Sequence, residues 1–200
     1  MIEFFRRAGG SPARLGILPG TFNPPTLAHV GLASAALSRV DEVLFVLPHV
    51  FPHKVYEGAA FEERIEMLRL ALSDEQRFSI GASGAGLFIE IARECRGAYG
   101  EDTGLSFLCG RDAAERVVNW DYGEPEAFPR MLEVFELLVA SRNGEYQPPP
   151  GMRHRIHPLP LQQDFDEVSA TRVRESIARG HAWEHLVAPT TIPLIRRTYR

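Results

Sequence analysis

The sequence predicts an α/β protein with a Rossmann-like open parallel sheet and helices on both of its faces. Short apolar runs of strand length alternate with helical patterns along the chain. Such alternation is typical of βαβ units, whose strands pair in parallel. A chain of 200 residues is long enough for one well-buried domain and short for two. We therefore expect a single domain over residues 1–200, with a helical C-terminal part from about residue 169.

The first half of the chain is expected to hold three strand–helix units. The strands are apolar runs rich in β-branched and aromatic residues, at Arg14–Leu18, Glu42–Leu47 and Arg77–Ile80. The helices that follow them span about His29–Arg39, Phe61–Leu72 and Leu87–Cys95. In the second helix the apolar residues recur at helical spacing, which places them on one face.

The second half repeats this alternation. Strands are expected at Leu105–Cys109, Phe135–Ser141 and Ile156–Pro160. A helix should begin at Arg111, a second should cover Ser169–Arg179 and a third Pro193–Tyr199. Gly180 is suited to end the second of these, because glycine accepts the left-handed conformation that follows many helices. The QPPPG segment is interpreted as a loop.

Composition excludes several classes of protein. The chain is 44% hydrophobic and 24% charged with a formal net charge of -4, which excludes a disordered chain and gives no global reason for nucleic-acid binding. Cys95 and Cys109 form no CxxC pair and are expected to be reduced thiols. We find neither a signal-peptide pattern nor an apolar run of the roughly 20 residues that span a membrane. A soluble, cytoplasmic protein is expected.

The segment PGTFNPPTLAHV, directly after the first strand, is the first candidate site. Ligands of open α/β sheets bind where strands end and helices begin. Gly20 allows close approach of a ligand, and Thr26 and His29 lie three apart, on one face of the first helical turn. Free backbone N–H groups, a hydroxyl and an imidazole together suit a phosphate. On these grounds alone, an ordinary turn capped by Thr26 is an equal alternative.

VSATRVRES, near the other end of the chain, is the second candidate site. Ser169 can cap a helix on which Thr171 and Arg174 lie three residues apart, on one face. Hydroxyls, free N–H groups and a guanidinium at a helix start again suit an anion, since arginine binds phosphate oxygens in bidentate fashion. A capped surface helix is the alternative.

The two segments, taken together, resemble the signatures of the nucleotidylyltransferase superfamily. GTFNPPTLAH is similar to its (H/T)xxH motif, and SATRVR is similar to its SxTxxR motif. The resemblance implies that His29 and Thr26 contact the reacting phosphate, with Gly20, Thr21 and Phe22 also at the nucleotide. It further implies that the second motif binds the β- and γ-phosphates, through Ser169, Thr171 and Arg174. Asn23 and Ala28 are mild departures from the usual Asp and Gly.

Other stretches resemble the bacterial nicotinate or nicotinamide mononucleotide adenylyltransferases over nearly the whole chain. PHK followed by FEERIEMLRLAL is similar to a segment of that group, which places Lys54 near phosphates. CGRDAAERVVNW matches its strand-end GxD followed by a tryptophan; the match implies nucleotide contacts at Gly110 and Asp112 and stacking of Trp120 on the pyridine ring. Arg142 matches the arginine that ends a later strand. Ordinary structural roles remain alternatives for Lys54, Asp112 and Trp120.

One departure leaves the acceptor open. The group usually carries a Tyr-Thr-x-Asp-Thr-like segment after the third strand, where this chain has FSIGASGAGL. Ser83 and Gly84 are therefore our candidates for acceptor contacts, acting with the backbone amides of this glycine-rich turn. The spacing GxxGxG does not match a dinucleotide fingerprint, which argues against a dehydrogenase. The pairs His181/His185 and His154/His157 are interpreted as incidental.

The reaction that these residues suggest is transfer of AMP from ATP to a phosphate monoester, most simply nicotinate or nicotinamide mononucleotide. Mg²⁺ is expected to arrive with the ATP, and no metal site is expected on the chain. A superfamily member with another acceptor, such as 4′-phosphopantetheine or a sugar or alcohol phosphate, is the first alternative. A non-catalytic nucleotide-binding module is the second. Neither nucleic acid nor membrane is an expected partner, and homo-oligomerisation is left open.

Overall fold

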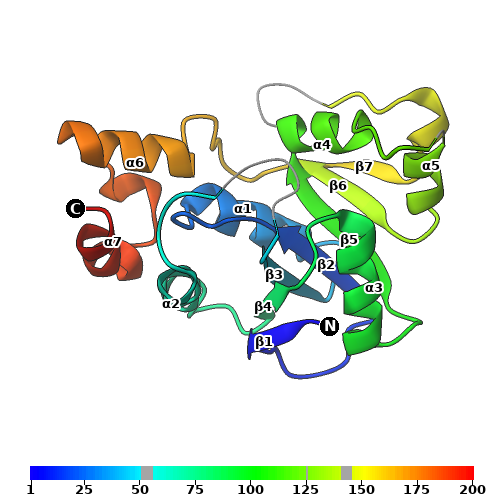
Figure 1. Ribbon diagram of the computed structural model, residues 1–200, viewed down its shortest axis with the longest axis horizontal. Helices are drawn as coiled ribbons and strands as arrows, with labels where there is room; N and C mark the ends of the chain where they lie inside the picture. The colour runs from blue at the N-terminus through cyan, green and yellow to red at the C-terminus, as the bar shows by residue number, and fades with distance from the viewer. Residues whose placement is uncertain (51–55, 125, 141–145) are drawn as a thin grey trace.

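The computed structural model describes residues 1–50, 56–124, 126–140 and 146–200, and in these residues the chain forms a seven-stranded sheet (Figure 1). The strands are β1 (Glu3–Arg6), β2 (Arg14–Pro19), β3 (Glu42–Pro48), β4 (Phe78–Ser83), β5 (Gly104–Gly110), β6 (Glu136–Ala140) and β7 (Ile156–Leu159). The helices are α1 (Leu27–Ala36), α2 (Phe61–Ala71), α3 (Phe88–Tyr99), α4 (Arg111–Val118), α5 (Ala127–Met131), α6 (Ala170–Arg179) and α7 (Ile192–Thr198). Three short 3₁₀ helices cover Pro150–Met152, Glu184–Leu186 and Pro189–Thr191.

The strand order is β1-β4-β3-β2-β5-β6-β7, and every neighbouring pair is parallel except β1 with β4. From β2 the chain builds outward to β3 and β4 on one side, and then returns to β5 and builds outward on the other. The order therefore reverses between β2 and β5. In open α/β sheets this switch point, at the carboxyl ends of the strands, is where ligands bind.

Burial on both faces of the central strands explains why they read as continuous apolar runs. All seven residues of β3 are buried, with Phe45 facing one layer and Leu44 the other. Helices α1 and α2 contribute to the cluster that contains Phe45, whereas α3, α4 and α5 contribute to the cluster that contains Phe107. The prediction of a Rossmann-like sheet covered on both faces is confirmed.

The C-terminal helices form a third cluster beside α2 rather than on the sheet. Val173 of α6 and Ile195 of α7 are fully buried in it, together with Met67 of α2. Figure 1 shows α6 and α7 next to α2, at the end of the molecule away from β6 and β7. This packing attaches the second candidate motif to the half of the sheet that carries the first.

Two elements were not predicted, and one strand is longer than predicted. The sequence patterns indicated neither β1 nor the five-residue α5. The third parallel strand runs to Ser83 instead of ending at Ile80, so Gly81 and Ser83 belong to a strand and not to a turn. Gly81 pairs with Phe4, and a Cβ on Gly81 would fall 2.8 Å from the side chain of Ile2. Pairing with β1 therefore outweighs the low strand propensity of this stretch.

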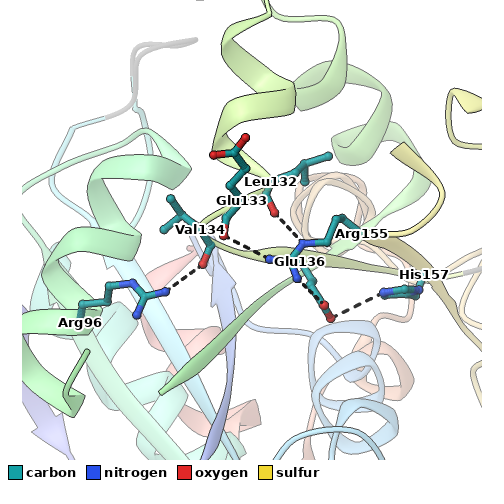
Figure 2. A network of polar contacts seen from close by, with 7 residues as sticks. All are labelled: Arg96, Leu132, Glu133, Val134, Glu136, Arg155 and His157. Atoms are coloured by element: carbon teal, nitrogen blue, oxygen red, sulfur yellow. Dashed lines mark hydrogen bonds and ion pairs between the residues drawn. The ribbon is translucent and has the colours of Figure 1, made fainter. Parts of the chain in front are cut away.

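At the amino ends of the strands, arginines connect α3, α5, β6 and β7 (Figure 2). Arg155 donates to two backbone carbonyls after α5 and, at 3.0 Å, to the Glu136 carboxylate. Nε2 of His157 lies 3.6 Å from the other Glu136 oxygen, and Arg96 donates to the carbonyl of Val134. This network lies opposite the switch point, so we assign it to packing.

Two further expectations concern the cysteines and membrane-spanning helices. Cys95 and Cys109 are both free and buried. Burial raises the pKa of each thiol to about 12, so both remain protonated at neutral pH. Among the described residues, we find no helix with the length and apolar character to span a bilayer.

Candidate active site

A cavity of about 670 Å³ lies at the switch point, at the carboxyl ends of β2 and β5. Both candidate motifs contribute to its wall, which is why we treat it as the candidate active site. The lining residues that were predicted from the sequence are Gly20, Thr21, Thr26, His29, Gly110, Trp120, Ser169 and Thr171.

The first motif begins α1 with a reciprocal cap that orients the imidazole. Thr26 is the N-cap, and its backbone N–H donates to Nδ1 of His29 at 3.0 Å. The Thr26 hydroxyl lies 2.8 Å from the same nitrogen. Because a backbone N–H can only donate, Nδ1 must be the acceptor, and a neutral ring carries its proton on Nε2. The cap thus makes Nε2 the donor of His29.

The loop between β2 and α1 is packed from within. The N–H of Gly20 donates to the carbonyl of Val46 at 3.0 Å, and a Cβ on Gly20 would fall 2.9 Å from the ring of Phe22. That ring is buried and lies edge-on to the imidazole of His29, with centroids 5.2 Å apart. Glycine is therefore required here by the Phe22 ring, a reason that the sequence did not reveal.

The second motif begins α6 and reaches back to the first. Ser169 is the N-cap, and its hydroxyl accepts from the N–H of Arg172 at 3.1 Å. Arg174 donates through Nη1 to the carbonyl of Asn23 at 2.5 Å and through Nη2 to the Thr171 hydroxyl at 3.4 Å. A direct hydrogen bond thus joins the two motifs, which the sequence separates by about 150 residues.

Asn23 connects four parts of the chain, and sequence reasoning treated it only as a departure from Asp. Its side-chain amide donates to the carbonyl of Glu57 at 3.1 Å, and its Oδ1 accepts from the N–H of Ala59 at 3.2 Å. The hydroxyl of Tyr199 also donates to Oδ1. Burial raises the pKa of Tyr199, which keeps this donor protonated. With Arg174 on its backbone carbonyl, Asn23 fixes the loop to α6, to the C-terminus and to residues 57–59.

Replacing Gly58 by alanine should destabilise the protein by displacing the side chain of Asn23. Gly58 has φ +148°, and a Cβ there would fall 2.0 Å from Nδ2 of Asn23, so the side chain must move and lose its hydrogen bonds. We expect a loss of about 1–3 kcal/mol in the free energy of unfolding, measured by urea denaturation. Gly10→Ala is the matched control, because Gly10 has φ +116° with no atom near its added Cβ. Equal losses in the two variants would show that backbone strain alone is responsible.

Part of the cavity wall is apolar and partly exposed. Trp120 follows α4 with 37% of its surface exposed, and Val50, which also lines the cavity, is 54% exposed. Phe88 also lines the cavity and is held by stacking on Phe107, with ring centroids 4.2 Å apart. Arg116 adds a positive charge to the wall. Exposed apolar side chains at a cavity mouth suit an aromatic ring of a ligand.

Several predicted site residues lie outside the described lining. The Ser83 hydroxyl is buried and accepts from the N–H of Ala85 at 3.1 Å, and neither Ser83 nor Gly84 lines the cavity, whereas Gly86 does. Asp112 is exposed in the first turn of α4, outside the lining. Arg174 is not among the lining residues either, and it donates to the backbone carbonyl of Asn23.

Two predicted residues cannot be placed, and two residues of the site were missed. Lys54 and Arg142 lie outside the described residues. Phe165 lines the cavity and packs over Gly31 of α1, where a Cβ would fall 2.3 Å from its ring. A glycine within a helical pattern was the available signal for this contact. Arg64 of α2 donates to the carbonyl of Thr21 at 3.0 Å, a contact that spacing alone does not indicate.

Comparison with known proteins places this fold and these motifs in one family. The family model described as cytidylyltransferase-like matches residues 17–176. A probable nicotinate-nucleotide adenylyltransferase of Gloeobacter violaceus is 31% identical over 92% of this chain and 94% of its own length. A Thermus thermophilus protein of the same name is 31% identical over 87% of this chain and 91% of its own length.

A solved structure has the same fold at much lower identity. The nicotinic acid mononucleotide adenylyltransferase of Plasmodium falciparum, complexed with NaAD, superposes with a TM-score of 0.69 and 14% identity over 92% of this chain and 95% of that one. Together with the matched family model and the two relatives, this likeness confirms the resemblance read from the motifs. The chain belongs to the cytidylyltransferase-like family of nucleotidyltransferases.

Proposed function

We propose that this enzyme transfers AMP from ATP to nicotinate or nicotinamide mononucleotide and releases pyrophosphate, a step of NAD biosynthesis. The observation that carries the proposal is the hydrogen bond between Arg174 and the carbonyl of Asn23. It joins two anion-binding helix starts at one cavity, with the Nε2 donor of His29 in its wall. The names of the relatives from Gloeobacter and Thermus support the choice of reaction.

The proposed reaction proceeds by direct displacement. A phosphate oxygen of the acceptor attacks the α-phosphorus of ATP in line, and the bond from that phosphorus to the bridging oxygen breaks, so that pyrophosphate leaves with the electron pair. The Nε2–H of His29 donates to an α-phosphate oxygen as negative charge accumulates there. The hydroxyls of Ser169 and Thr171 and the free N–H groups that begin α6 bind the β- and γ-phosphates.

Mg²⁺ is part of this proposal as an ion bound to the triphosphate. Among the described residues, no three His, Cys, Asp or Glu side chains come together as a metal site. Bound in this way, Mg²⁺ neutralises charge on the leaving phosphates. A cytoplasmic location, the absence of nucleic-acid and membrane partners, and the oligomeric state stay predictions.

The apolar side chains of the cavity wall support a pyridine nucleotide as the acceptor. Trp120 and Phe88 offer flat apolar surfaces, and Arg116 offers positive charge to an anionic acceptor. The Plasmodium falciparum protein was solved in complex with NaAD, which is consistent with this choice. The absence of the Tyr-Thr-x-Asp-Thr-like segment keeps another phosphate monoester as the alternative within the family.

Trp120→Ala should weaken acceptor binding and leave ATP binding unchanged. Stacking on an aromatic side chain contributes about 1–3 kcal/mol per base, so we expect KM for nicotinate mononucleotide to rise roughly 5- to 100-fold, with a smaller change in kcat. Steady-state kinetics with each substrate varied in turn provide the measurement. A rise in KM for ATP of the same size would place Trp120 at the adenine end of the cavity instead.

The reaction itself is tested by measuring pyrophosphate release with ATP or CTP and a panel of phosphate acceptors. Turnover with ATP and nicotinate or nicotinamide mononucleotide supports the proposal. Turnover only with 4′-phosphopantetheine or with a sugar or alcohol phosphate identifies the alternative acceptor. Binding of ATP without release of pyrophosphate from any acceptor would identify a non-catalytic nucleotide-binding module.

A further inference from the structure

Arg64 is a buried cation for which the described residues supply no carboxylate partner. It lies on α2 with 4% of its surface exposed, and Nη1 donates to the backbone carbonyl of Thr21 at 3.0 Å. The guanidinium lies over the ring of Tyr56, 4.2 Å from its centroid, and Nε has no hydrogen-bond partner within the described chain. Burial lowers the pKa of this guanidinium. An isolated buried charge destabilises a fold, so its presence calls for a role.

The contact with Thr21 sets the direction of one peptide group. The bond from Thr21 to Phe22 is trans, so its N–H points opposite to its C=O. Arg64 holds that carbonyl from outside the cavity lining, whereas Thr21 itself lines the cavity. The N–H of Phe22 therefore points away from Arg64, on the side of the peptide group where Thr21 lines the cavity, although Phe22 itself is buried and is not among the lining residues. Among the described residues it makes no hydrogen bond, which leaves it available to a ligand.

The backbone of Phe22 needs such a restraint. Its φ of +47° is in the left-handed region, which costs a residue other than glycine about 1–3 kcal/mol and persists only where the surroundings enforce it. Arg64 holds the peptide group that precedes Phe22, through the carbonyl of Thr21, and Arg174 holds the peptide group that follows Asn23, through the carbonyl of that residue. Two helices far apart in the sequence thus determine one loop conformation.

We propose that Arg64 is a positioning residue, which orients the N–H of Phe22 as a donor to a phosphate of the nucleotide. Arg64 touches no substrate, and it acts through the peptide group of Thr21 and Phe22. This inference rests on the proposed function, because the phosphate in question belongs to the nucleotide that the cavity would bind. Transfer would then depend on α2, which carries Arg64, as well as on the helices that carry the two motifs.

Arg64→Met tests the proposal, because methionine fills similar space without a donor or a charge. A shift of about 1 Å in a group that binds the transition state can lower a rate by about 10²-fold, and we expect kcat to fall roughly 10- to 100-fold with KM for the acceptor nearly unchanged. Arg64→Lys retains one donor and should recover part of the loss. Arg6→Met is the matched control, since Arg6 donates to the carbonyls of Leu72 and Glu75 beyond the other end of α2.

A second measurement separates this inference from the proposed function. The ¹⁵N–¹H signal of Phe22 should shift when pyrophosphate is added to the wild type and to Arg6→Met, and the shift should be lost in Arg64→Met. A folded Arg64→Met enzyme with wild-type kcat, or with an unchanged Phe22 shift, overturns the positioning role while the proposed function stands. A wild type that turns over no acceptor overturns the proposed function, and the Phe22 shift then decides the role of Arg64 by itself.

Discussion

Replacing His29 by alanine should lower kcat for pyrophosphate release by about 10²–10³. Loss of one donor that faces charge developing in a transition state costs roughly 3–4 kcal/mol, which corresponds to that factor. The structure sharpens the reason for this expectation. Nδ1 is used by the N–H of Thr26, so the ring presents Nε2 as its donor, and the imidazole lies in the cavity wall edge-on to Phe22.

His29 also has a structural role, and a second variant separates the two. In His29→Asn the amide oxygen can occupy the place of Nδ1 and accept from the N–H of Thr26, but no donor reaches the place of Nε2. We expect this variant to unfold at nearly the wild-type temperature and to be as slow as His29→Ala. His154→Ala, at an exposed histidine outside the described cavity lining, is the control and should retain full activity. Wild-type rates in a folded His29→Ala enzyme would contradict the mechanism.

The sequence predicted the parallel part of the sheet because burial on both faces leaves a simple pattern. β3 and β5 are apolar runs bounded by turns. The observed β3 is one residue longer than predicted, at its carboxyl end, and the observed β5 is one residue longer at each end. β1 was not predicted, because its four residues of mixed polarity, EFFR, form a strand only by pairing with β4. Pairing of this kind is a tertiary contact, and no local pattern reports it.

In the candidate site, too, local spacing could be predicted from the sequence and contacts between distant residues could not. Thr26 and His29 lie within one turn, so their spacing was sufficient to predict that they meet. Arg64, Arg174 and Tyr199 approach the same loop from distant parts of the sequence. The two arginines donate to backbone carbonyls of the loop, and Tyr199 donates to the side-chain amide of Asn23. Any residue type supplies a backbone carbonyl, so contacts of this kind leave no mark in the sequence of the loop that they hold.

Arg174→Ala should produce the second large effect, a fall in kcat/KM for ATP of about 10²-fold or more. Two losses are combined in it. In the proposed reaction the guanidinium would contact the leaving phosphates through N–H groups other than those that donate to Asn23 and Thr171, and neither alanine nor lysine reproduces such an interaction. It also donates to the carbonyl of Asn23, and loss of a charged hydrogen bond of this kind lowers stability by about 1.5–3 kcal/mol. We therefore expect Arg174→Lys to recover part of the stability and little of the activity.

Tyr199→Phe distinguishes loss of the phosphate contact from loosening of the loop. This variant removes the hydroxyl that donates to Oδ1 of Asn23 and leaves Arg174 in place, so it weakens the same loop without removing a cation. If Arg174 binds phosphate, kcat/KM for ATP should fall much further in Arg174→Ala than in Tyr199→Phe at a matched loss of stability, measured by denaturation and kinetics on the same preparations. Equal falls in kcat/KM would mean that Arg174 serves only to hold Asn23, and the second motif would then contact the nucleotide through its hydroxyls and backbone alone.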